Sequence, residues 1–307
     1  MTATIIFILA GTLAATVPLL LAAMGELVAE KSGMLNLGVE GMMAVGAAAG
    51  FVTVALTGSH ALGLLAGGLA ALILSAVFAL LSIFFLANQV AAGLAIGILG
   101  LGVSAGIGKS YEGTTVAPMP KLSLGPLSDI PVIGRALFSH DIMVYAAIAT
   151  AFAVWLVLQR TKLGLIIRAV GESPQSSHSL GYPVALIRTC CVLFGGALAG
   201  IGGAYLSTAY TPLWADGMVA GRGWIVVALV VFGTWIVPRI TMGAYLFGAF
   251  SLLELSIQGL GLNVPSQLLS ASPYIVTIIV LVVISRNPAL IQLNSPRSLG
   301  QTYRPCG

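Results

Sequence analysis

Four charged side chains gather in the apolar stretch of residues 26–41. An ionisable group at membrane depth costs roughly 2.5–3.5 kcal/mol on insertion scales, so it is normally paired or faces a polar cavity. Glu26 and Glu30 are most simply interpreted as part of a charged turn in the aqueous interface. Glu40 lies farther along the stretch, with Asn36 four residues before it. Asn36 and Glu40 are therefore the first candidates for a polar pathway.

Asn36 and Glu40 allow two interpretations. Asn36 could cap the helix that follows, with Glu40 near the positive end of that helix. Alternatively, Gly33, Gly38 and Gly41 break a helix, and the two polar side chains face a transport pathway, as broken helices do in membrane transporters. The sequence leaves both interpretations open.

A second polar segment, residues 159–188, contains the signals of a short helix. Ser173 suits the capping position, Pro174 suits the first turn, and Gly181 suits the end. A single short helix held between two apolar runs could dock a partner protein. A solvated connector is the alternative for this loop taken alone.

The remaining residues do not suggest enzyme chemistry. Glu254 lies inside an apolar run and is a further pathway candidate. The three histidines follow no metal spacing, and the three cysteines predict no disulfide framework. Residues 103–110 resemble a phosphate-binding loop but begin with Val103 instead of glycine. We therefore expect no catalytic residue, no metal and no cofactor.

The elements that carry these residues are apolar runs long enough to cross a bilayer. Charged residues make up 7% of the chain, against about 25% in a soluble domain, and the mean hydropathy is +1.06. We predict an all-α protein, a polytopic transmembrane bundle of about eight to ten spans. It forms a single membrane domain over residues 1–307, with a broken or re-entrant segment near residues 26–41. The candidate spans are Ile5–Met24, Met42–Thr57, Ala61–Leu86, Val90–Gly108, Ile142–Leu158, Thr189–Tyr210, Trp224–Val237, Thr241–Leu260 and Pro273–Ser285.

The basic residues predict an orientation. Four of them lie in the loop 159–188 and three in the tail 286–307, and Lys and Arg in short loops favour the cytoplasmic side. We expect the loop, the tail and the C-terminus to be cytoplasmic and the N-terminus to be outside. Since the basic residues lie mostly at span ends, the net charge of +4 does not indicate nucleic-acid binding.

Small residues recur every four positions in one apolar run, at Gly196, Gly200 and Ala204. This small-xxx-small pattern lets helix backbones approach closely in a membrane. We therefore expect a tight helix-packing seam there.

Residues 30–43, which read EKSGMLNLGVEGMM, closely resemble the signature of membrane permeases from bacterial ABC importers. The broader family serves branched-chain amino acids and ribose. The sequence of residues 30–43 is similar to the signature of the branch that handles nucleosides. Residues 168–174, followed by Gly181, are similar to the cytoplasmic coupling segment of that family. Ser177 and His178 depart from the family's usual pair of alanines, so contacts with the ATPase would differ there.

The resemblance implies a permease subunit of the bacterial plasma membrane that is not itself an enzyme. Its partners would be a second permease subunit, cytoplasmic ATP-binding subunits and an extracytoplasmic substrate-binding lipoprotein. The substrate would be a nucleoside, and a simple sugar such as ribose is the alternative substrate. An ion-coupled secondary transporter is the alternative to an ABC importer. The resemblance also implies the residues that couple the permease to its ATPases, which are Gly171, Glu172, Ser173, Pro174 and Gly181.

Overall fold

The computed structural model describes residues 2–122, 138–259 and 294–304, together with Ile275, Ile278, Ile279 and Val282. The described part is built of helices, and its β-contacts are two isolated bridges. The elements are α1 (Thr2–Lys31), α2 (Val39–Thr57), α3 (His60–Ala79) with η1 (Leu80–Phe84), α4 (Gln89–Gly108) with η2 (Lys109–Tyr111), α6 (Ile142–Arg160), α7 (Lys162–Glu172), α8 (Pro174–Ser179), α9 (Val184–Tyr205) with η4 (Leu206–Tyr210), α10 (Arg222–Phe232) and α11 (Val237–Gly259).

Six helices in the described ranges are long and apolar enough to cross a membrane, which confirms the predicted polytopic helical bundle. Polar residues mark where several of them begin. The side chains of Ser59, Asn88 and Asp141 accept N–H groups from the first turns of α3, α4 and α6. These caps satisfy backbone donors that would otherwise lack a partner at the helix start.

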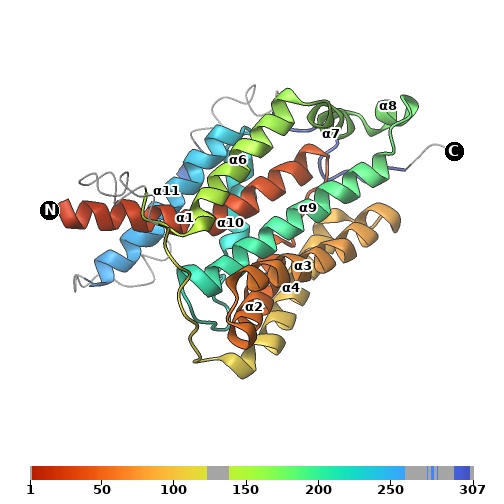
Figure 1. Ribbon diagram of the computed structural model, residues 1–307. Helices are drawn as coiled ribbons and strands as arrows, with labels where there is room; N and C mark the ends of the chain where they lie inside the picture. Colours follow the sequence, from red (N-terminus) through yellow and green to blue (C-terminus); the bar gives the residue numbers. More distant parts are fainter. Residues whose placement is uncertain are drawn as a thin grey trace.

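Helix α9 packs against α1 on one side and against α2 and α3 on the other (Figure 1). The stripe of small residues makes this possible. A side chain on Gly196 would collide with Ser75 of α3, and one on Gly200 would collide with the backbone of Gly67. Ala204 continues the stripe against Gly67 and Gly50. The predicted seam thus lies between α9, α3 and α2.

The chain is interrupted between α1 and α2, where a broken segment was predicted. Residues 32–38 form a turn and an irregular stretch, with Gly33 at φ +90°. Helix α2 then begins beside the middle of α4, because Gly41 lies against Gly97. Gly97 is eight residues beyond the start of α4, or about 12 Å along that helix. The N-terminus of α2 therefore lies inside the bundle.

The seventh predicted span, Trp224–Val237, is wrong as a single helix. Helix α10 ends at Phe232 and α11 begins at Val237, with Thr234 and Trp235 at positive φ in the break. The 11 residues of α10 extend about 16 Å, roughly half of the hydrocarbon thickness. Helix α11 then returns beside α1 (Figure 1). The ninth predicted span, Pro273–Ser285, lies outside the described residues apart from four single positions.

Candidate functional site

Glu40 joins the starts of two helices inside the bundle. It lies in the first turn of α2, but its carboxylate accepts N–H groups at the start of α10, from Gly221 at 2.8 Å and Gly223 at 2.6 Å. The side chain is 5% exposed. A negative group is favoured at a helix N-terminus, where backbone N–H groups lack partners. Glu40 therefore stabilises α10, a helix that lies far away in the sequence.

Asn36 does not cap α2, contrary to one of the two interpretations. The capping position belongs to Gly38, which offers no side chain. The Asn36 Oδ1 atom instead accepts the Gly38 N–H at 3.0 Å, and its Nδ2 atom donates to the Met42 sulfur at 3.4 Å. Asn36 is fully buried. Its side chain thus fixes the irregular stretch that leads into α2.

Glu26 and Glu30 are buried, so their interpretation as a charged turn in water is wrong. Helix α1 continues through Lys31 and leaves them 1% and 0% exposed. Glu26 accepts the backbone N–H of Asn36 at 3.2 Å, and Glu30 accepts the indole N–H of Trp235. The two carboxyl groups lie four residues apart on α1 and interact with each other.

These two bonds connect α1 to both interruptions of the bundle. Glu26 holds the irregular stretch before α2, and Glu30 holds the break between α10 and α11. Trp235 could not be recognised from the sequence, because a tryptophan in an apolar run resembles any other membrane residue. The spacing of two glutamates four residues apart was the available signal, since it places both on one helix face.

The coupling candidates form a helix–turn–helix unit at one end of the bundle (Figure 1). The Ser173 hydroxyl accepts the Ser176 N–H at 3.2 Å, Pro174 occupies the first turn of α8, and Gly181 follows that helix at φ +86°. Gly171 is buried, and Glu172 lies 3.7 Å from Arg297 of the tail. Helix α8 exposes a polar face, with Gln175, Ser176, His178 and Ser179 accessible.

Glu254 falls in the last turns of α11, where only the backbone belongs to the described structure. In the described residues, no group of three or more His, Cys, Asp or Glu side chains could hold a metal ion.

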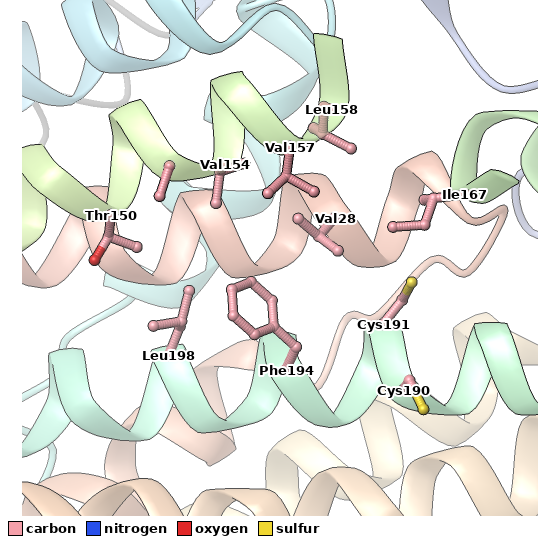
Figure 2. A pocket seen from close by; sticks show the side chains of 11 residues that line it. Val28, Thr150, Val154, Val157, Leu158, Ile167, Cys190, Cys191, Phe194 and Leu198 are labelled. Carbon is pink, nitrogen blue, oxygen red and sulfur yellow. The ribbon is translucent and has the colours of Figure 1, made fainter. Parts of the chain in front are cut away.

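An apolar pocket of about 480 Å³ lies between α1, α6, α7 and α9. In Figure 2, Val28 of α1 lies between the labelled side chains of α6 and those of α9. Hydroxyl-rich solutes need hydrogen-bond partners, and this lining offers almost none. The pocket is lined by Val28, Thr150, Ala153, Val154, Val157, Leu158, Ile167, Cys190, Cys191, Phe194 and Leu198.

A smaller pocket of about 280 Å³ has charged walls and lies where α4 ends. Lys109, Glu112 and Asp216 line it together with Trp214. The start of α4 is twenty residues away, so this pocket is about 30 Å from the opposite end of the bundle. The segment that follows Trp214 leads to Gly221, where α10 meets Glu40. The chain thus runs from this charged pocket to the buried start of α10.

Comparison with known proteins gives relatives over nearly the full length. A putative glucose ABC transporter permease of Haloferax volcanii is 39% identical, covering 96% of this chain and 97% of the relative. A guanosine ABC transporter permease of Bacillus subtilis is 34% identical over 89% and 90%, and a nucleoside ABC transporter permease of Lactococcus lactis is 32% identical over 91% and 92%.

No solved structure matches the chain. Its relatives are permease components of ABC transporters, which are transport proteins and not enzymes. Residues 8–285 match the family described as the permease component of the branched-chain amino acid transport system. The resemblance seen in the signature around Glu40 is thereby confirmed, and the chain belongs to this permease family.

Proposed function

We propose that this protein is the permease subunit of an ATP-driven importer for nucleosides. The observation that carries the proposal is its relationship, over about nine tenths of each chain, to guanosine and nucleoside permeases. The polar groups support a transport role, because Glu40 and Asn36 lie at an interruption inside an otherwise apolar bundle. Broken helices whose N-termini meet inside a membrane bundle commonly form part of a substrate pathway.

The transport complex would contain a second permease subunit, cytoplasmic ATP-binding subunits and an extracytoplasmic substrate-binding lipoprotein. The exposed polar face of α8 is the surface on which we expect the ATP-binding subunits to act. It lies in the loop with the most basic residues, which favours a cytoplasmic position. The N-terminus would then be outside, and the charged pocket at the end of α4 would face the lipoprotein.

A simple sugar is the second candidate substrate. The relative with 39% identity is a putative glucose permease, and a nucleoside itself contains a ribose ring. A pathway that accepts the hydroxyl groups of ribose shares chemistry with one that accepts a free sugar.

Uptake by the assembled complex tests the proposal. Cells that express the chain together with a second permease subunit, ATP-binding subunits and a substrate-binding lipoprotein would receive labelled guanosine, ribose or glucose. Cells that carry an ATPase unable to hydrolyse ATP are the matched control. Guanosine uptake above this control supports a nucleoside importer, and a preference for ribose or glucose supports the sugar alternative. Uptake that persists in the control cells would contradict an ATP-driven mechanism.

A further inference from the structure

The C-terminal segment of residues 294–303, which we term the strap, crosses the end of the bundle where α1 ends and α4 and α9 begin. The backbone oxygen of Asn294 accepts a hydrogen bond from the Lys31 ammonium group at 2.7 Å. The backbone oxygen of Gln301 accepts a hydrogen bond from the Gln89 side-chain amide at 3.1 Å. Gly300 donates its N–H to the Gly33 oxygen at 3.3 Å. The strap therefore contacts α1, α4 and the turn after α1.

The strap is also bonded to the proposed coupling unit. Ser298 donates twice to the backbone oxygen of Gly171, from its N–H at 3.0 Å and from its hydroxyl at 2.6 Å. A side chain on Gly171 would collide with the backbone oxygen of Lys31 and approach Pro296. The end of α7 is thus pressed between α1 and the strap, without room for a side chain.

Arg188 of α9 joins the same groups from inside the bundle. It is 2% exposed, and its guanidinium group donates to the Ser32 oxygen at 3.1 Å and to the Ser298 hydroxyl at 2.9 Å. It also donates to the Gln301 oxygen at 3.4 Å and lies 5.9 Å from the centre of the Tyr303 ring. A buried guanidinium group needs such partners, so its position fixes theirs.

We infer that the strap is the mechanical link between the α7–α8 unit and the turn that precedes α2, with Ser298 and Arg188 as its positioning residues. This inference rests on the proposed function, in which ATPases act on α7–α8. A displacement of Gly171 moves Ser298, which shares the guanidinium group of Arg188 with Ser32 of the turn. The turn continues through Asn36 into α2 and Glu40, and so into the interior of the bundle.

Hydrogen exchange on the purified chain tests the link without any partner. Ser298→Ala removes the hydroxyl that joins Gly171 to Arg188. We expect faster amide exchange in two separate regions, residues 31–38 and residues 169–176. Thr189→Ala is the matched control, because the Thr189 hydroxyl donates only within α9, to Ala185. Faster exchange in residues 169–176 alone would overturn the link.

Coupling is then measured in the assembled complex with Ser298→Ala, its control Thr189→Ala, and a third variant, Arg188→Gln. We expect Ser298→Ala to lower substrate uptake per ATP hydrolysed by about fivefold, the effect of losing one buried hydrogen bond. Arg188→Gln should lower the ratio further, with the ATP hydrolysis rate kept. An unchanged ratio in Ser298→Ala would overturn the coupling role of the strap. If the unaltered complex moves no solute, the proposed function fails, and the exchange experiment still decides whether the link exists.

Discussion

At the scale of single residues, the polar groups of this bundle connect segments that are distant in sequence. Glu26, Glu30 and Glu40 each accept a hydrogen bond from outside their own helix. A buried carboxylate without such partners would be strongly unfavourable. Since each partner lies at an interruption of the helices, the glutamates hold the irregular segments in place. Their removal should therefore be visible in stability.

Glu40→Gln should lower the free energy of unfolding by about 1–3 kcal/mol, because an amide offers one oxygen where the carboxylate serves two N–H groups. Thermal unfolding of the purified chain measures this effect. Glu172→Gln is the control, since Glu172 is half exposed and an exposed ion pair contributes little. A variant with an unchanged midpoint and abolished transport would instead assign Glu40 to contact with substrate.

Trp235→Phe should destabilise the chain by roughly 1–3 kcal/mol, the cost of leaving a buried acceptor without its donor. An aromatic ring remains, although a smaller one, and Glu30 loses its indole donor. Trp224→Phe, at an exposed tryptophan of α10, is the matched control. Combining Trp235→Phe with Glu30→Gln should cost less than the sum of the two single effects. Additive effects would rule out the bond as the reason for the loss.

At the scale of elements, the sequence was sufficient for most helices and insufficient for their interruptions. Long apolar runs end at polar residues, so the predicted bounds of α4 and α6 are close to the observed ones. The break at residues 233–236 has no charge, and Gly233 within it and Pro238 just after it are its local signals. The predicted span Ile5–Met24 ends earlier than α1, because a charged residue such as Glu26 resembles the start of a loop. Burial by distant partners cannot be read from local composition.

The packing seam predicts a contrast between two glycines. Gly200→Ala should destabilise the bundle by about 1–3 kcal/mol, because its new methyl group would meet the backbone of α3 and force the helices apart. Gly106→Ala in α4 has open space around it and should be neutral or stabilising by up to about 1 kcal/mol. Thermal unfolding of both variants checks the contrast. Equal effects would mean that the seam does not limit the stability of the bundle.

At the scale of the whole molecule, polar groups are concentrated at the two ends and along the interrupted segments between them. The charged pocket occupies one end, and the α7–α8 unit with the strap occupies the other. The sequence pointed to α7–α8 through its capping residues and through the family resemblance. It did not point to the strap, because a short polar tail carries no periodic pattern. Only the folded chain brings Ser298 to Gly171.

Replacing Glu172 and Pro174 by alanine should uncouple ATP hydrolysis from uptake and leave the bundle folded. Glu172 ends α7 and is half exposed, and Pro174, although buried, begins α8; both lie away from the packed seam. The assembled complex would be assayed for ATP hydrolysis and for uptake, and circular dichroism would check the fold. Normal uptake by the double variant would exclude a docking role for this unit.

The bond between Glu40 and α10 has a consequence for biosynthesis. Gly223 is made 183 residues after Glu40, an interval of roughly 10–40 s at the pace of a ribosome. During that interval the Glu40 carboxylate lacks its final partners, and inserting it into the membrane as a charge would cost roughly 2.5–3.5 kcal/mol. Until α10 arrives, the nascent N-terminal half must therefore keep Glu40 in contact with water or with a chaperone, or keep it protonated.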